Sequence, residues 1–210
     1  PTFGVRRPAR TWRADVVVFA GGVLGTVDLL LAMKGRADGL PNLSDRVGES
    51  VRTNSESIIG VTANSAADYT RGVAIGAALH TDPRSHLETV RYPAGAGLFR
   101  TMVLPHAPGG TFAARIGASV RYLLANPRRA LTALFVEDWA KSTAILLYMR
   151  TGEGTLAFGR GPLGLRSRVT AGEAPVASIP EASELAMAFG RKVDGFVVSL
   201  FTETLMGIPS

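Results

Sequence analysis

The sequence lacks cysteine and has few aromatic residues, and each shortage excludes a class of chemistry. Without cysteine the chain has no disulfide, no thiolate nucleophile, and no zinc or iron–sulfur site held by sulfur. Aromatic residues make up 7% of the 210 residues, and they form no stacking pattern among the arginines. We therefore interpret the net charge of +6 as a solvated basic face and expect no nucleic-acid partner.

Histidines are also scarce, and their spacing does not favour a metal site. His80, His86 and His106 are not two or four residues apart, the separations that place ligands on one face of a strand or helix. We predict solvated or hydrogen-bonded loop histidines and no metal. The Gly-x-Ser-x-Gly pattern of the α/β-hydrolase nucleophile is absent as well, which argues against a hydrolase.

The longest apolar stretch, from Val16 to Met33, has the length of a membrane-spanning helix but not its composition. It contains Asp28 and several glycines, and its β-branched start changes to helical spacing after them. We predict a short buried strand over 15–20, a Gly-Gly turn and then a helix, with no transmembrane segment. No signal-peptide pattern follows Pro1, so we expect a soluble piece of a longer protein whose compartment the sequence leaves open.

The remaining chain alternates between strand patterns and helix patterns, separated by turn residues. In order we predict a loop (35–48), a strand (51–63), antiparallel strands (69–103), two helices (112–125, 126–140), a hairpin (144–150 with 155–158), an exposed strand (165–170) and a helix (180–207). This order predicts an α+β fold, in which part of a nucleotide-binding α/β layer joins an antiparallel sheet backed by helices. We place the first domain at residues 1–57 and the second at residues 58–210.

The glycine cluster AGGVLG, residues 20–25, stands where a dinucleotide-binding loop would stand, between a predicted strand and a predicted helix. Ala20, Gly22 and Gly25 have the spacing of G-x-G-x-x-G with the first glycine replaced. In that motif the glycines let a pyrophosphate approach the helix N-terminus. The acidic residue expected about twenty positions later, at the end of a second strand, is missing. From the pattern alone, a tightly packed structural turn and a phosphate loop both remain open.

Two segments near the start carry a resemblance to a known family. ADVVVFAGGVLGTVDLLL (14–31) and GLPNLSDRVGESVRTNSE (39–56) resemble the glucose–methanol–choline (GMC) family of FAD-dependent oxidoreductases, and within it the cholesterol-oxidase-like branch. Looser likenesses to that branch follow in RYPAG (91–95) and in LLYMRTGEGTLAF (146–158). The resemblance spans most of the chain and is specific in its first quarter.

The resemblance implies an FAD-binding domain, here represented by residues 1–57, and a substrate domain over residues 58–210. It makes AGGVLG the point where the chain returns to the FAD domain, with the main phosphate loop elsewhere in the family's sequence. Gly21, Gly22 and Gly25 would then lie near the cofactor, and Asn54 near the flavin or the entrance to the site.

The resemblance also implies a reaction for the parent enzyme and the absence of its catalytic residues from this chain. It points to hydride transfer from a bulky, apolar, sterol-like alcohol to FAD. The family's catalytic histidine follows a segment like the one that ends this chain, so we expect an interior fragment with no catalytic residue, no metal and no tight grip on FAD. Residues 96–99 stand where the branch carries a glutamate, so sterol isomerisation is not expected. The isolated chain should be inactive.

Two other functions remain open at this point. The antiparallel sheet and the helices of 112–140 could form an apolar pocket in a non-catalytic lipid-binding module, which needs nothing outside the chain. An NAD-dependent Rossmann enzyme could use AGGVLG as its phosphate loop, although the missing acid weighs against it. We also expect homo-oligomers to form through the exposed part of the incomplete FAD-domain layer.

Overall fold

The structure is a computed structural model that describes residues 10–53, 55–64, 67–162, 164–176 and 178–207. The chain divides into two compact units. We call Pro1–Val51 with Ala157–Arg168 the small unit, and Arg52–Leu156 with Val169–Ser210 the large unit. The assignment of residues 1–57 to FAD binding and of the rest to substrate binding stays a prediction.

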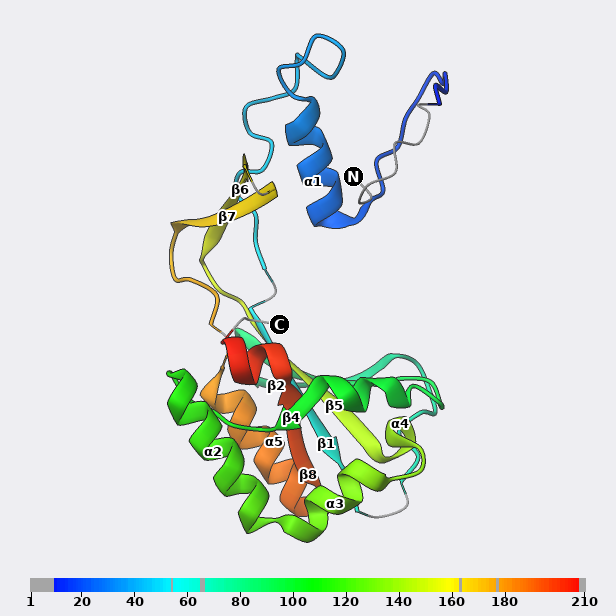
Figure 1. The fold of residues 1–210 in the computed structure, drawn as a ribbon, viewed down its shortest axis with the longest axis vertical. Helices are drawn as coiled ribbons and strands as arrows, with labels where there is room; N and C mark the ends of the chain where they lie inside the picture. Colours follow the sequence, from blue (N-terminus) through cyan, green and yellow to red (C-terminus); the bar gives the residue numbers. More distant parts are fainter. Residues whose placement is uncertain (1–9, 54, 65–66, 163, 177, 208–210) are drawn as a thin grey trace. The chain divides into compact units, whose positions relative to one another are not determined.

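The large unit is built on a six-stranded sheet, whose neighbouring strands pair antiparallel in the order β2-β3-β5-β1-β8-β4 (Figure 1). β1 lies inside the sheet, and its two neighbours come from much later in the sequence. The strands are β1 (Glu56–Thr62), β2 (Ile75–Asp82), β3 (Ser85–Val90), β4 (Val103–Pro105), β5 (Thr143–Arg150) and β8 (Phe196–Leu200).

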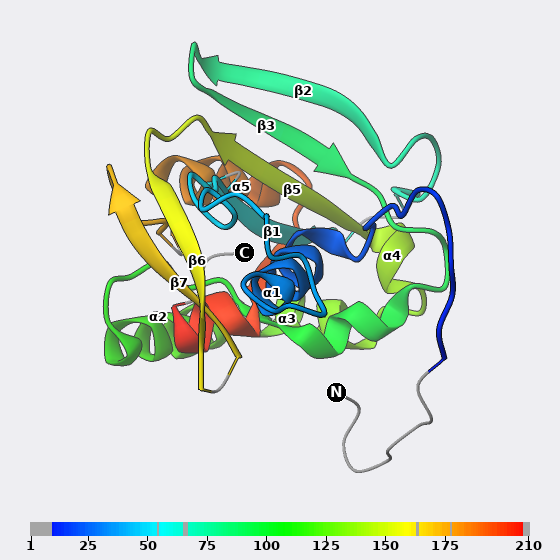
Figure 2. The same cartoon turned by 90° about the horizontal axis from the view of Figure 1, so that it is seen from above.

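Helices cover both faces of the central strands (Figure 2). Successive side chains along a strand point to opposite faces of the sheet, so the apolar residues of β8 need packing partners on both faces. Val197 packs in one buried cluster with Ala182 and Ala186, whereas Phe196 and Val198 pack in another with residues of α3. The helical segments are α2 (Phe112–Ala125), α3 (Pro127–Phe135), α4 (Trp139–Ser142), α5 (Pro180–Lys192), a 3-10 helix (Gly97–Met102) and a π-helix (Thr202–Met206).

The small unit contains α1 (Gly22–Met33) and most of a two-stranded sheet of β6 (Thr155–Gly161) and β7 (Gly164–Ala171). Arg160 donates to Asp28 of α1 at 2.9 Å, and the Phe158 N–H donates to the Gly48 carbonyl at 2.7 Å. Gly48 has a φ of +85°, and a Cβ there would meet the Phe158 oxygen at 2.5 Å, so this position requires glycine. No residue of α1 is buried.

The structure confirms the α+β fold, the helices after residue 21 and over 112–125, and the strand over 165–170. The predicted strand over 15–20 is wrong. Those residues form no strand, and the side chains of Val16, Val17 and Val18 are 78%, 65% and 82% exposed. A strand needs a neighbour for its backbone hydrogen bonds, and in the part of the chain that the structure describes no segment pairs with this one.

Four further predictions are wrong in detail. The 144–150 strand forms no hairpin with 155–158, because both edges of β5 are already paired, with β1 and with β3. The helix predicted to 207 ends at Lys192, where the left-handed Asp194 redirects the chain into strand β8. Between α3 and α4 the helical pattern breaks at Val136, and a 3-10 helix stands within the predicted strands of 69–103. Among the described residues, no helix is both long and apolar enough to cross a membrane.

Candidate functional site

The glycines predicted to contact a cofactor lie at the exposed start of α1. Gly21 precedes the helix, and its N–H donates to Oγ1 of Thr26 at 3.2 Å. Gly22 has a φ of +71°, which favours glycine, and a Cβ added to Gly22 or Gly25 would meet no described atom within 4 Å. A helix start with free space and forward-pointing N–H groups suits an anionic group. Cofactor binding by these glycines stays a prediction.

Asn54, the fourth residue predicted to lie near the cofactor, is outside the described residues. Its neighbours belong to the large unit. The Ser55 carbonyl accepts from the Arg150 N–H at 3.3 Å, and Arg52 donates to the Gly152 carbonyl at 3.3 Å. These contacts hold the start of β1 beside the end of β5.

A second candidate site, which we name the His106 pocket, lies in the large unit where β4 meets β8. His106 follows β4, and its backbone N–H donates to the Val197 carbonyl at 3.0 Å, which continues the pairing of the two strands. The imidazole is 5% exposed, and its Nδ1 lies 2.5 Å from Oγ of Ser199. Its Nε2 has no hydrogen-bond partner among the described residues, and the ring lines a cavity of about 510 Å³.

The π-helix after β8 supplies another wall of the His106 pocket. Glu203 accepts from the Ser57 hydroxyl at 3.1 Å, and Thr204 is buried, with an Oγ1 that also finds no described partner. Arg115 of α2 donates to the Thr204 carbonyl at 2.7 Å, and its other donors reach three further backbone carbonyls, those of Gly109, Gly110 and Leu205. The guanidinium group therefore fastens the loop and the π-helix around the pocket.

Burial sets the electrostatics of this pocket. Loss of hydration lowers the pKa of His106 from 6.5 to about 4, because the charged imidazolium is the form that burial disfavours. The ring is therefore neutral near neutral pH. Beside this neutral ring, the lining contains two ionisable side chains, the Arg115 guanidinium group, which is bound to backbone carbonyls, and the Glu203 carboxyl group.

Sequence reasoning missed this pocket. His106 fits the prediction of a hydrogen-bonded loop histidine, but its partner lay inside a segment predicted as helix. The signal that was available is the run FVVSL, residues 196–200, whose β-branched, apolar composition is typical of a central strand.

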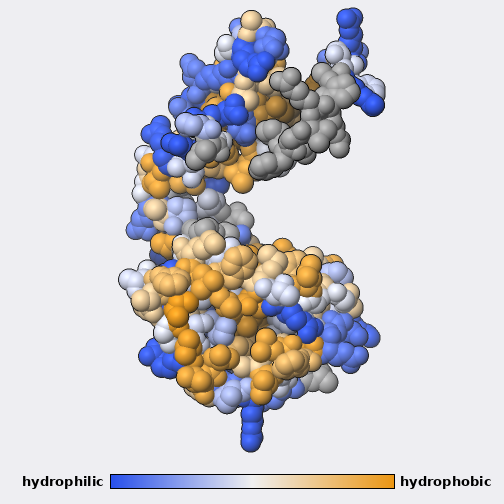
Figure 3. Space-filling view, in the orientation of Figure 1, coloured by the Kyte–Doolittle hydropathy of each residue, from blue (hydrophilic) through white to orange (hydrophobic). Residues whose placement is uncertain are grey.

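An apolar cavity of about 190 Å³ lies on the other face of the sheet, between helix and strand. Leu123 of α2, Ala133 of α3 and Val198 of β8 contribute to its lining. Figure 3 shows apolar side chains gathered over the helices of the large unit. The large apolar side chains of the 3-10 helix, α2 and α3 that are exposed are Leu98, Phe99, Met102, Phe112, Val120, Leu123, Leu124, Leu131, Leu134 and Phe135. This region matches the apolar pocket that a lipid-binding module would need.

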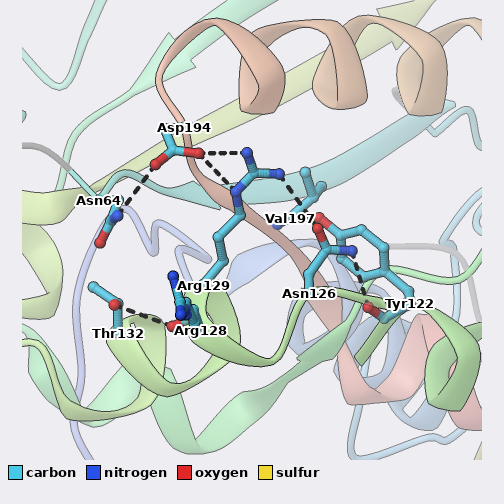
Figure 4. Close-up of polar contacts among 8 residues, drawn as sticks. All are labelled: Asn64, Tyr122, Asn126, Arg128, Arg129, Thr132, Asp194 and Val197. Carbon is cyan, nitrogen blue, oxygen red and sulfur yellow. Dashed lines mark hydrogen bonds and ion pairs between the residues drawn. The ribbon is translucent and has the colours of Figure 1, made fainter. Parts of the chain in front are cut away.

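A polar network fixes the start of α3 near this cavity (Figure 4). Arg129 makes an ion pair with Asp194, Asn64 donates to the same carboxylate at 3.2 Å, and Arg129 also donates to Asn126 at 3.3 Å. The hydrogen bond from Asn64 and the guanidinium group of Arg129 lower the pKa of Asp194. The network joins α3, the end of β1 and the turn before β8, and it is structural. No group of His, Asp and Glu side chains in the described ranges could hold a metal ion.

Comparison with known proteins finds relatives over almost the whole chain. Cholesterol oxidase of Mycobacterium tuberculosis, in strains CDC 1551 / Oshkosh and ATCC 25618 / H37Rv, is 34% identical over 217 aligned residues and 98% of this chain. Cholesterol oxidase of Acinetobacter baumannii is 32% identical over 209 residues and 95% of this chain. The chain spans 37% of the length of these relatives. No protein-family model and no solved structure matches it.

Proposed function

We propose that this chain is part of an FAD-dependent oxidoreductase of the GMC family, which oxidises a bulky, apolar, sterol-like alcohol. The observation that carries the proposal is the similarity to cholesterol oxidases over 98% of the chain. The two segments at 14–31 and 39–56 carry the resemblance to the same family in the sequence. In this proposal the first domain, 1–57, helps to bind FAD and the second, 58–210, binds the alcohol.

The start of α1 fits a role beside FAD. Gly22 and Gly25 leave room for close approach, and the first N–H groups of a helix favour a negatively charged group. FAD, when bound, supplies the hydride acceptor for the alcohol carbon. The chain's own residues would bind and orient: the helix start would approach the cofactor, and the apolar interior of the large unit would keep water from the alcohol.

We assign no catalytic residue to this chain, and we expect it to hold FAD only weakly by itself. Titration of FAD into the 210-residue chain, followed by flavin fluorescence, should show no tight, stoichiometric binding. The protein translated from the complete reading frame around these residues should retain one FAD through purification. Tight binding by the chain alone would contradict our assignment of the main cofactor contacts to other residues, and a signal specific to NAD would favour a Rossmann enzyme.

A non-catalytic lipid-binding module is the second candidate, because the cavity between α2, α3 and the sheet is lined almost wholly by apolar side chains. The flavin-free chain would then bind a fluorescent sterol such as dehydroergosterol in a saturable manner. Ala133→Phe, which places a large side chain in the lining, should abolish that binding, whereas Val169→Phe at a 45% exposed position should not. Saturable sterol binding by a complete protein that retains no FAD would favour this module over the oxidoreductase.

A further inference from the structure

Helices α2 and α3 turn most of their large apolar side chains outward. α2 buries Arg115 and Ser119, and α3 buries Ala130 and Ala133. A surface helix of a globular protein usually has the reverse arrangement, with its apolar stripe against the core and its polar residues outside. The two helices therefore present an apolar surface to their surroundings.

Three exposed apolar residues on each helix share the i, i+3, i+4 spacing that places side chains on one helix face. They are Val120, Leu123 and Leu124 of α2 and Leu131, Leu134 and Phe135 of α3. Leu124 is 74% exposed and Phe135 is 79% exposed, so these two side chains project into the solvent. We call the six residues, together with Arg121 and Arg128, the α2–α3 face.

The charge of this face has one sign. Residues 112–135 contain no aspartate or glutamate. Arg121 and Arg128 are exposed, and neither has an ion-pair partner among the described residues. Each precedes an exposed leucine by three residues, Leu124 and Leu131 respectively, so cation and apolar side chain lie on the same side of the helix.

The acids nearest to the α2–α3 face are mostly engaged elsewhere. Asp194, at the start of α3, forms the ion pair with Arg129. Glu137 and Asp138 follow α3, and the Asp138 carboxylate caps α4 by accepting from two backbone N–H groups. The free charge on the two helices is therefore positive.

We propose that the α2–α3 face docks on the surface of an anionic lipid bilayer. Apolar residues interleaved with arginines are typical of helices that lie in a membrane interface, because acyl chains receive the apolar side chains and headgroup phosphates receive the cations. The long stem of an arginine can lie along the apolar surface while its guanidinium group reaches the headgroups.

Charge argues against a second copy of this chain as the occupant. Two α2–α3 faces in contact would bring Arg121 and Arg128 of both copies together, and like charges across an interface are unfavourable. The face lies within the large unit, and the proposal rests neither on FAD nor on the oxidation of an alcohol.

The absence of cysteine lets one fluorophore report on the α2–α3 face, because a single introduced cysteine is labelled uniquely. Leu124→Cys and Phe135→Cys, each carrying a nitrobenzoxadiazole group, should brighten about twofold or more on vesicles of phosphatidylcholine and phosphatidylglycerol, as the label leaves water. Val73→Cys, at a 67% exposed position before β2, is the matched control and should not change. No response at either helix position, or an equal response at Val73, would overturn the proposal. Brightening that depends on protein concentration and needs no vesicles would replace the bilayer with a second copy.

Two double variants with the same loss of charge test the arginines. Arg121→Gln with Arg128→Gln should weaken vesicle binding about twentyfold, because each cation near an anionic surface contributes about 1 kcal/mol, or roughly fivefold. Arg166→Gln with Arg168→Gln, at exposed positions of β7, should have a much smaller effect. Sedimentation with sucrose-loaded vesicles measures both, and binding of the parent chain should fall as salt is added. Equal weakening by the two double variants, or equal binding to phosphatidylcholine alone, would contradict the assignment to this face.

The protein translated from the complete reading frame provides the last test. It should bind the same vesicles, and Leu124→Gln with Phe135→Gln should weaken that binding about tenfold or more, because both substitutions remove apolar surface from the bilayer. A complete protein that binds no vesicles would show that other residues cover the face, and the proposal would be wrong. That result would leave the proposed oxidoreductase untouched, because its test is the flavin.

Discussion

The two units of this chain differ in how far they bury their apolar residues. In the large unit, Ile59, Val61 and Val197 are each no more than 1% exposed and lie between antiparallel strands and α5. In the small unit, α1 buries no residue, and the valines at 16–18 are largely exposed. The comparison shows that an apolar run is buried only where the chain also supplies a partner surface. The large unit carries its own core, and the small unit presents apolar surface that is free to contact something else.

The largest expected effect is a direct test of this contrast in core packing. Ile59→Ala should lower the free energy of unfolding by about 2–5 kcal/mol, because it removes buried methylene groups and leaves a cavity. Val17→Ala, at a 65% exposed side chain of the small unit, should change it by no more than about 0.5 kcal/mol. Urea unfolding followed by circular dichroism measures both. Equal losses would show that the stretch at 15–20 is buried after all.

Acidification should expose a second property of the large unit. The pKa of His106 is about 4 in the folded chain against 6.5 for a free imidazole, so between these values the unfolded chain binds more protons. The contribution of His106 to the free energy of unfolding is therefore fully present above pH 6.5. It is lost as the pH drops toward 4, by a total on the order of 3 kcal/mol.

Unfolding free energies measured across pH 4 to 7 check this slope. His106→Gln, which cannot take up the proton, should flatten it, and His80→Gln, at an exposed position in β2, should leave it in place. A slope that survives His106→Gln would assign the effect to another group.

The start of α1 allows a finer test in the small unit. Gly22→Ala should cost about 1 kcal/mol, since φ is +71° there, whereas Gly25→Ala inside the helix should stabilise α1 by a similar amount. Hydrogen exchange of the α1 amides measures these changes locally. In the complete protein both substitutions should also weaken FAD binding, because each adds a methyl group where we place the cofactor. Unchanged FAD affinity in both would remove the glycines from the proposed site.

The sequence predicted what local patterns determine. Helical spacing in FAARIGASVRYLLA matches α2, and the turn residues of 35–48 match the loop between α1 and β1. Prediction from the sequence failed where the structure of a segment depends on which other segments pack or pair with it. The stretch at 15–20 has the composition of a strand, but no described strand lies beside it. Residues 196–200 were predicted as part of a helix, and they form strand β8 inside the sheet.

The candidate site was harder to predict than the fold for the same reason. His106 and Ser199 are 93 residues apart, and only the pairing of β4 with β8 brings their side chains within 2.5 Å. Neither residue belongs to a recognisable motif. The glycines at 21, 22 and 25 were visible in the sequence because their spacing is local, yet the structure shows an open helix start and leaves their ligand to experiment.

The central claim is that this chain supplies part of an FAD-dependent alcohol oxidoreductase, and the redox state of the flavin tests it most directly. The protein translated from the complete reading frame should be purified, made anaerobic and mixed with cholesterol while the flavin absorption is recorded. We predict that the oxidised flavin band disappears as the alcohol is consumed and returns when an electron acceptor is added. A purified, folded protein that carries no flavin, or whose flavin stays oxidised with cholesterol and with simpler apolar alcohols, would contradict the claim.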